Sequence, residues 1–202
     1  MVLSRHDDAR FSWNDYQKFP KEERWEIIQG EAFAMTPAPS TRHQAVSGEL
    51  FAALHAFFGG TTCKAFAAPT DVRLSEIDIV QPDILVVCDK EQIRETHIEG
   101  PPRLVIEILS PSSCIYDRGR KLDLYARSGI AELWLVSTYP SLVEVLVLDG
   151  DSYRVRHAYA REQTLQSPSF PDLEIDLAQV FDFPIDPNEE IVLIKESRPV
   201  YG

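Results

Sequence analysis

The middle of the chain contains the run RLVIEIL at residues 103–109, which is nearly continuous in leucine, valine and isoleucine. A short apolar run bounded by turn residues is typical of a buried β-strand. The turn sequence SPSS follows it, and a capped helix is expected from Asp117 to Ser128, with Gly129 at its end. The apolar run at residues 132–136 predicts another strand. This part of the chain therefore predicts a strand, a helix and a strand.

Two more apolar runs precede this unit, at residues 66–74 and 79–88. The first run is interrupted by Pro69, and the second contains Pro82. We interpret each run as one strand. A helix is expected before them, between a cap at residues 40–41 and the glycines at residues 59–60. Its apolar residues recur at helical spacing, which predicts a stripe packed on a core: Val46, Leu50, Leu54 and Phe57. The order helix, three strands, helix, strand predicts an α/β (α+β) fold with a central mixed sheet flanked by helices.

The two ends of the chain add smaller elements. A short helix is expected at residues 13–18, followed by an N-terminal hairpin at residues 25–35. The runs at residues 143–148 and 153–159 flank Asp-Gly-Asp and predict a second hairpin. The last forty residues contain one apolar run, Ile191 to Ile194, which is either an edge strand or a partner-binding arm. We expect one domain over residues 1–202, with residues 160–202 as a C-terminal extension.

Composition limits the functional classes. The chain has 202 residues and a formal net charge of −12, with a sequence pI of about 4.8, so most of its surface should repel a phosphate backbone. The sequence has no run of 18 apolar residues and a polar N-terminus, so we expect a cytoplasmic protein without a membrane span. The three cysteines form no C-x-x-C pair, which favours reduced buried thiols over a zinc site or a disulfide framework.

Two carboxylates are embedded in apolar strands. Asp83 precedes four apolar residues, and Glu107 lies inside the run at residues 103–109. Burying an ionised carboxylate without a partner is so unfavourable that each acid needs a cation, a metal ion or hydrogen-bond donors. If the two strands are adjacent, both acids can face one divalent ion. The alternative is a structural ion pair with an arginine such as Arg103 or Arg73.

A lysine on the following helix is the third candidate. Lys121, Leu122 and Tyr125 share one helix face, so Lys121 borders the apolar side. Its ammonium either reaches across to the two acids or extends along the surface to solvent. Position 109 lies on the same strand face as Glu107, but it holds leucine instead of a second lysine.

These residues resemble the conserved motifs of the Uma2 (DUF820) family. The resemblance covers roughly residues 11–150 and is carried by several segments in the family's order: 25–31, 37–40, 43–44, 69–74, 80–84, 105–112, 117–118, 121–125 and 129–134. Uma2 proteins are placed in the PD-(D/E)xK nuclease superfamily. The core of that superfamily is a helix, three strands, a helix and a strand, the order derived above from apolar patterning alone.

The resemblance implies a restriction-endonuclease-like fold and metal-dependent phosphodiester hydrolysis. Asp83 and Glu107 would bind the metal together with the main-chain carbonyl of Ile108, and Mg²⁺ is the expected ion, with Mn²⁺ as a substitute. Because Leu109 stands where the superfamily has its lysine, Lys121 would take that role from the next helix. The resemblance also places Glu49, Glu26, His43 and Gln44 near the site. Glu49 is a loose match, and Glu26 either lines the site or braces the hairpin. For His43, a structural role is the alternative.

Two functions follow as hypotheses. The first is a Mg²⁺-dependent endonuclease acting on nucleic acid, with DNA favoured as the substrate. It can act as a homodimer. Four basic residues on one helix would form a local strip for the phosphate backbone, or else a solvated face: Arg118, Arg120, Lys121 and Arg127. The second hypothesis is a non-catalytic module of the same fold that binds a protein partner or nucleic acid. The costly acid pair favours the first, and the acidity of the chain favours the second.

Overall fold

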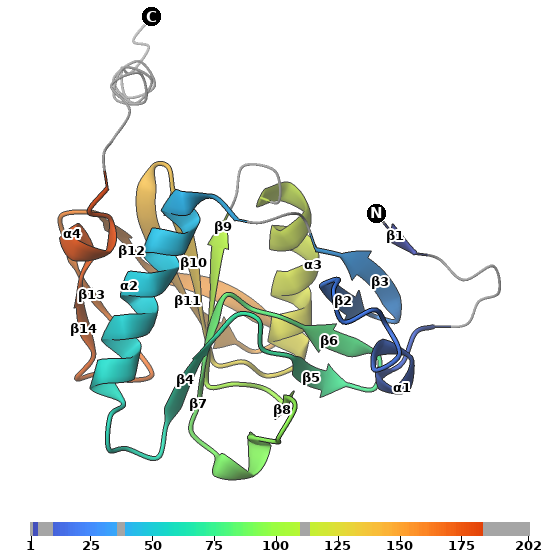
Figure 1. Ribbon diagram of the computed structural model, residues 1–202. Coiled ribbons are helices and arrows are strands. Elements are labelled where there is room, and N and C mark those ends of the chain that lie inside the picture. Colours follow the sequence, from blue (N-terminus) through green and yellow to red (C-terminus); the bar gives the residue numbers. More distant parts are fainter. Residues whose placement is uncertain (1, 4–9, 36–38, 110–113, 184–202) are drawn as a thin grey trace, which may run out of the picture.

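Two six-stranded sheets form the body of the protein (Figure 1). The structure is a computed structural model that describes residues 2–3, 10–35, 39–109 and 114–183, without the side chains of residues 2–3 and 114–118. The central sheet contains, in spatial order, β12 (Ser152–Ala160), β11 (Ser141–Asp149), β10 (Glu132–Thr138), β9 (Leu104–Leu109), β7 (Ile84–Val87) and β4 (Lys64–Ala67). The N-terminal sheet contains β1 (Val2–Leu3), β3 (Glu31–Ala34), β2 (Trp25–Ile28), β6 (Asp78–Val80), β5 (Val72–Ser75) and β8 (Ile98–Glu99).

The remaining elements are helices and one small strand pair. They are α1 (Trp13–Tyr16), α2 (Thr41–Phe57), the 3₁₀ helix η1 (Lys90–Gln92), α3 (Cys114–Arg127), β13 (Thr164–Gln166), β14 (Glu174–Asp176) and α4 (Leu177–Val180). Strands β9 and β10 are parallel and are joined through α3, whereas the other pairings of the central sheet are antiparallel. The predicted mixed sheet flanked by helices is therefore confirmed.

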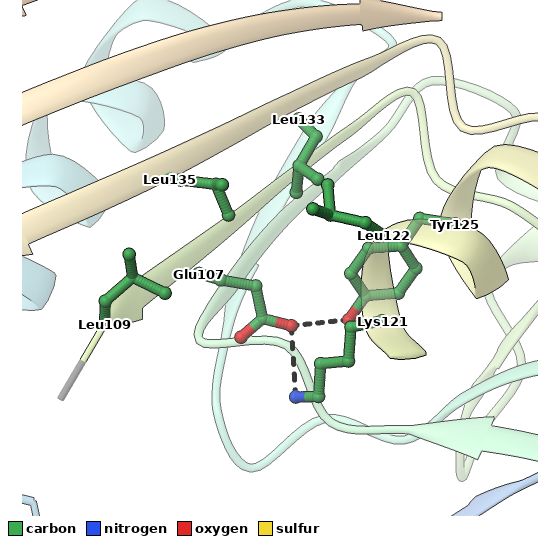
Figure 2. A pocket seen from close by; sticks show the side chains of 7 residues that line it. All are labelled: Glu107, Leu109, Lys121, Leu122, Tyr125, Leu133 and Leu135. Carbon is green, nitrogen blue, oxygen red and sulfur yellow. Dashed lines mark hydrogen bonds and ion pairs between the residues drawn. The ribbon is translucent and has the colours of Figure 1, made fainter. Parts of the chain in front are cut away.

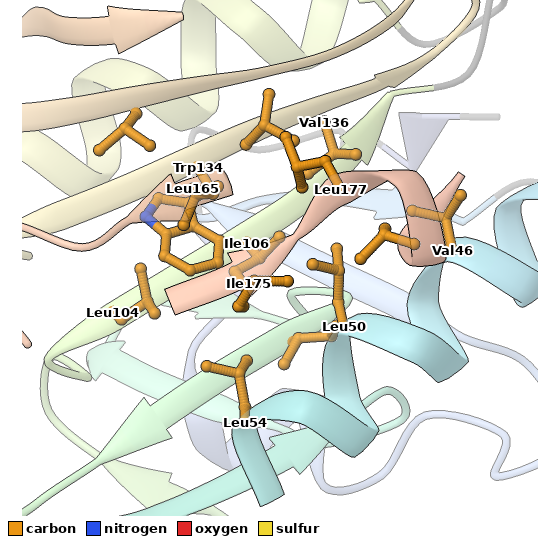
Figure 3. Close-up of a cluster of buried hydrophobic side chains, with 14 of the residues drawn as sticks. Val46, Leu50, Leu54, Leu104, Ile106, Trp134, Val136, Leu165, Ile175 and Leu177 are labelled. Carbon is orange, nitrogen blue, oxygen red and sulfur yellow. The ribbon is translucent and has the colours of Figure 1, made fainter. Parts of the chain in front are cut away.

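Each face of the central sheet has its own core. Helices α2 and α4 pack on one face, where Val46, Leu50 and Leu54 contact strand residues such as Ile106 and Trp134 (Figure 3). Helix α3 packs on the other face through Leu124 and Tyr125. The predicted α2 stripe is correct except at its end, where Phe58 is buried and Phe57 is only partly buried.

Helix α2 begins where its sequence predicts. The Ser40 side chain caps it by accepting a hydrogen bond from the main-chain N–H of His43 at 3.2 Å. A cap of this kind stabilises a helix by about 1 kcal/mol. It also fixes the first turn of α2, which carries His43, beside Asp83 at the start of β7.

The prediction of one strand in each of the runs 66–74 and 79–88 was wrong. Each run forms two strands, β4 and β5 in the first and β6 and β7 in the second, and the two members belong to different sheets. Pro69 and Pro82 lie at the two crossings. Proline has no N–H to donate to a strand ladder, so the chain leaves one sheet at each proline and enters the other.

The outer elements agree with expectation in type and differ in length. Both hairpins are present, as β2–β3 and β11–β12. Helix α1 ends at Tyr16, earlier than predicted, and α3 begins at Cys114, three residues before Asp117. The run Ile191 to Ile194 lies outside the described residues. In the described part of the chain, no helix is both long and apolar enough to cross a membrane.

The cysteine prediction was wrong for two of the three residues. Cys63 and Cys88 form a disulfide. The antiparallel register of β4 and β7 pairs Lys64 with Val87 and thereby sets the two cysteines opposite each other. Pairing between strands distant in sequence cannot be deduced from cysteine spacing.

Candidate active site

The register of β7 and β9 brings Asp83 and Glu107 together. Ile84 is paired with Ile106, so Asp83, which directly precedes β7, lies at the position opposite Glu107. Side chains alternate along a strand. Leu85 and Val105, two residues from each acid, belong to the core on the α3 side. Asp83 and Glu107 therefore share the α3 face of the sheet.

Asp83 is held by donors from two elements. Its Oδ2 accepts a hydrogen bond from the main-chain N–H of Ile108 at 2.8 Å and lies 3.3 Å from His43 Nε2. Burial by itself lowers the pKa of His43, but the hydrogen bond and charge of Asp83, with a contribution from the main chain of Ile108, outweigh it and raise that pKa. The first turn of α2 thus places an imidazole with a raised proton affinity against Asp83.

Glu107 is held by helix α3. Its Oε1 accepts a hydrogen bond from the Tyr125 hydroxyl at 2.5 Å and from Lys121 Nζ at 3.2 Å (Figure 2). Burial is the main cause that raises the pKa of Glu107 to about 7, and the charges of Asp83 and Glu26 add to it, whereas Lys121 and Tyr125 oppose it. Glu107 is therefore partly protonated near neutral pH.

Lys121 bridges two carboxylates from different sheets. Its Nζ lies 2.9 Å from Glu26 Oε1 and 3.2 Å from Glu107 Oε1, and the three side chains are only 9%, 8% and 13% exposed, respectively. Glu26 Oε1 also accepts the main-chain N–H of Gln81 at 3.0 Å. Glu26 therefore lines the site and also braces β2 against the segment that leads to Asp83.

The wall beside Glu107 is apolar. A cavity of about 10 Å³ adjoins Glu107 and Lys121, with Leu109, Leu133 and Leu135 among its other lining residues (Figure 2). This volume has room for about one water molecule. With leucine at position 109, the amine at the site comes from α3.

Comparison with known proteins places the chain in a family. Residues 13–178 match the family model Uma2, described as "Putative restriction endonuclease". The chain belongs to the Uma2 family. Its relatives include two uncharacterized proteins of Synechocystis sp. (strain ATCC 27184 / PCC 6803 / Kazusa). The protein slr1290 is 29% identical over 133 residues, covering 64% of this chain and 66% of the relative. The protein sll1609 is 28% identical over 138 residues, covering 67% and 71%.

The Uma2 assignment agrees with the fold of a solved structure. A chain from Anabaena variabilis ATCC 29413, described as "a putative nuclease belonging to DUF820", superposes with a TM-score of 0.70 at 20% sequence identity. The match covers 84% of this chain and 97% of the neighbour. The chain spans about two thirds of the length of the first Synechocystis relative. These comparisons establish the family and the restriction-endonuclease-like fold.

Not every residue that the sequence suggested reaches this Uma2 site. Glu49 and Gln44 are exposed on α2, and among the described residues neither is a hydrogen-bond or ion-pair partner of Asp83 or Glu107. Arg73 pairs with Glu99 and Glu76, so it is not the partner of Asp83 or Glu107.

The basic strip predicted on α3 is neutralised by acids of the N-terminal sheet. Arg120 lies 2.7 Å from Glu31, and Arg127 lies 2.8 Å from Asp78. The side chain of Arg118 is outside the described residues. Helix α3 therefore contributes Lys121 to the site, while two of its arginines attach the helix to the neighbouring sheet.

The prediction from sequence did not assign two residues to the site, Tyr125 and Gln81. Tyr125 binds Glu107, and Gln81 donates its main-chain N–H to Glu26. Tyr125 follows Lys121 by one helical turn, which was the available signal, but an aromatic residue on an apolar helix face is usually part of a core. The contribution of Gln81 is made by its backbone, which carries no sequence signal.

The donor groups suit a hard divalent cation. Asp83 and Glu107 supply carboxylate oxygens, the ligand type that Mg²⁺ prefers. The second oxygen of each, Asp83 Oδ1 and Glu107 Oε2, accepts no hydrogen bond from the described residues. No group of three or more His, Cys, Asp or Glu side chains that could hold a metal occurs within those residues. A cation here would therefore keep several water ligands, as Mg²⁺ commonly does.

Proposed function

We propose that this Uma2 protein is a Mg²⁺-dependent endonuclease that hydrolyses phosphodiester bonds in DNA. The observation that carries the proposal is the Lys121 ammonium, which lies between Glu26 and Glu107 on the sheet face that also presents Asp83. Two carboxylates and one amine are the groups that the resemblance to the PD-(D/E)xK superfamily implies for metal-dependent phosphodiester hydrolysis. Burying the Lys121 ammonium costs free energy, and an apolar side chain of similar volume would fill the same space at a lower cost.

The residues that would hold the ion are Asp83, Glu107 and the main-chain carbonyl of Ile108. When bound, Mg²⁺ supplies a water with a lowered pKa and offsets negative charge on the phosphate. Mn²⁺ has similar ligand preferences and should substitute for it. Glu107 has to release its proton to act as a ligand.

The chain's own residues orient the reacting groups. The Ile108 N–H and His43 hold Asp83 Oδ2 and leave Oδ1 directed elsewhere. Lys121 and Tyr125 hold Glu107 Oε1 in the same way. The Lys121 ammonium, held by Glu26 and Glu107, would donate a hydrogen bond to a phosphate oxygen when substrate binds, a contribution of roughly 3 kcal/mol if it resembles other single donors aimed at developing charge.

Nucleases of this fold often pair to cut the two strands of a duplex, so a homodimer is part of the proposal. A second candidate function is a non-catalytic module that binds nucleic acid or a protein partner. It is favoured by the net charge of −12 and by the engagement of Arg120 and Arg127 with acids, because both features weaken non-specific binding to a duplex.

A cleavage assay separates the two candidates. Purified protein is incubated with plasmid DNA and with single-stranded DNA, in Mg²⁺ or Mn²⁺ and in EDTA. We expect cleavage with either ion and none in EDTA. Glu107→Gln should lose cleavage at least about 100-fold, since it removes a metal ligand, whereas Glu162→Gln, at an exposed acid, should retain it. Equal cleavage by both variants would remove the endonuclease proposal.

A further inference from the structure

A second, larger pocket lies beside α1 and β2. Its volume is about 470 Å³, within the range of small-molecule sites. Trp13, Tyr16, Phe19 and Trp25 form its aromatic part. Trp13 and Tyr16 are stacked with ring centroids 5.6 Å apart, and Phe19 meets Trp25 edge to face at 5.6 Å. The Tyr16 and Phe19 side chains are only partly buried, so a planar ligand has aromatic surface to pack against.

The polar part of this pocket is a fixed network. Gln81 Nε2 donates to Asp71 Oδ1 at 2.8 Å and to the Tyr16 hydroxyl at 3.1 Å, and Gln81 Oε1 accepts from Arg24 Nε at 2.8 Å. The Tyr16 hydroxyl donates to Asp71 Oδ1 at 2.6 Å. Burial, reinforced by Asp71, raises the pKa of Tyr16, so this donor stays protonated. The network orients Arg24 and Asp71 without using all their hydrogen-bonding atoms.

One hydrogen-bond donor and one acceptor of this network have no hydrogen-bond partner among the described residues. Arg24 Nη2 is buried and has no hydrogen-bond partner among the described residues. Asp71 Oδ2 likewise accepts no hydrogen bond from them. A buried guanidinium nitrogen without a partner is costly, and a ligand that accepts its proton would remove the cost. Arg24 and Asp71 line the same pocket, and a donor and an acceptor are the two kinds of group that pair with the edge of a nucleobase, where acceptor and donor atoms alternate.

The pocket is connected to the candidate active site through one residue. The Gln81 side chain belongs to the pocket network, and its main-chain N–H binds Glu26 at the site. Asp83 follows Gln81 by two residues. Lys21 also lines the pocket and is exposed, so a cation is available there for a phosphate group.

We propose that this pocket binds one unstacked nucleobase together with its phosphate. The base comes either from a strand held at the Asp83–Glu107 site or from a free mononucleotide, and the first source rests on the proposed function. Stacking on aromatic rings is tolerant of base identity, whereas Arg24 and Asp71 select among bases by their hydrogen-bonding edges.

Tryptophan fluorescence tests the proposal in EDTA, where no cleavage occurs. Trp13 and Trp25 line the pocket, while Trp134 is buried in the core. The probes are AMP, GMP, CMP and TMP, and a single-stranded oligonucleotide carrying one 2-aminopurine. Saturable quenching by a mononucleotide shows the free source, and quenching by the oligonucleotide alone shows the strand source. No saturable quenching with any probe overturns the proposal.

Two variants and a matched control assign the binding to the pocket. Arg24→Ala should weaken binding ~10-fold or more, the scale of one removed base contact. Arg154→Ala removes the same charge from an arginine that is 70% exposed on β12 and should bind like the wild type. Asp71→Asn keeps an acceptor for Tyr16 and Gln81 but can replace the second acceptor with a donor, so it should change which base binds best. Equal affinity in Arg24→Ala and Arg154→Ala, or an unchanged base preference in Asp71→Asn, contradicts the assignment.

Base binding by the pocket and DNA cleavage at the candidate active site can be tested separately. Glu107→Gln should bind a free mononucleotide like the wild type, because Glu107 does not line the pocket, while losing cleavage. Binding that depends on Arg24 in a protein that never cleaves DNA would support the pocket and reject the nuclease. Mg²⁺-dependent cleavage without base binding would support the nuclease and reject the pocket proposal.

Discussion

Replacing Lys121 with methionine is expected to abolish most activity and to destabilise the protein at pH 8. The substitution keeps the length of the side chain but removes the ammonium that lies against Glu26 and Glu107, two side chains that are almost fully buried. Breaking a buried ion pair by removing one partner costs about 3–5 kcal/mol, because the remaining charge is uncompensated. Cleavage should fall at least about 100-fold, the usual effect of losing one donor aimed at developing charge. Urea unfolding and the plasmid assay measure the two effects.

A double variant separates the structural role of Lys121 from its role in cleavage. Glu26→Gln keeps the oxygen that accepts the Gln81 N–H and removes one of the two charges. Combined with Lys121→Met, it should recover much of the lost stability and none of the activity. A Lys121→Met protein as stable as the wild type at pH 8 would show that the ammonium does not compensate these acids.

The second large effect is a pH dependence of stability that arises from Glu107. Folding raises the pKa of Glu107 from its ordinary value of 4.5 to about 7, chiefly through burial. The folded protein therefore binds this proton more tightly than the unfolded chain. The resulting stability is fully present below pH 4.5 and is lost as the pH rises through 7. The loss is on the order of 3 kcal/mol, since each unit of pKa corresponds to about 1.4 kcal/mol.

Glu107→Gln removes this titration and should remove the pH dependence with it. In EDTA, the free energy of unfolding of the variant relative to wild type should increase between pH 4.5 and pH 8 by on the order of 3 kcal/mol. Urea unfolding at the two pH values measures the change, with Glu162→Gln as the exposed-acid control. Wild-type and Glu107→Gln curves that remain parallel over this range would mean that Glu107 is ionised without cost.

The elements around the site could be predicted from local sequence, but their pairing could not. The apolar run of β9, the Ser40 cap of α2 and the Asp-Gly turn of the second hairpin are local signals, and each produced the expected element. The register that sets Asp83 opposite Glu107 depends on pairing between β7 and β9, which are 16 residues apart, with β8 of the other sheet between them. The sequence established that two costly acids exist, and only the register shows that they meet.

The strand and cysteine predictions were wrong because strand pairing is not a local property of the sequence. A single strand across Pro69 or Pro82 is not formed, because the missing N–H of each proline marks a change of sheet. The disulfide of Cys63 and Cys88 follows from the β4–β7 register. Glu49 lies near the apolar stripe in sequence yet is exposed, because two positions on a helix can be one residue apart and face different directions.

Direct titration of Mn²⁺ by calorimetry tests whether Asp83 and Glu107 bind one cation. We expect one-site binding by the wild type, with affinity that increases as the pH is raised through 7, because Glu107 has to lose its proton. Asp83→Asn and Glu107→Gln should each lose this binding, while Glu162→Gln retains it. Mn²⁺ affinity that is the same in all four proteins would contradict a shared metal site and the hydrolytic mechanism built on it.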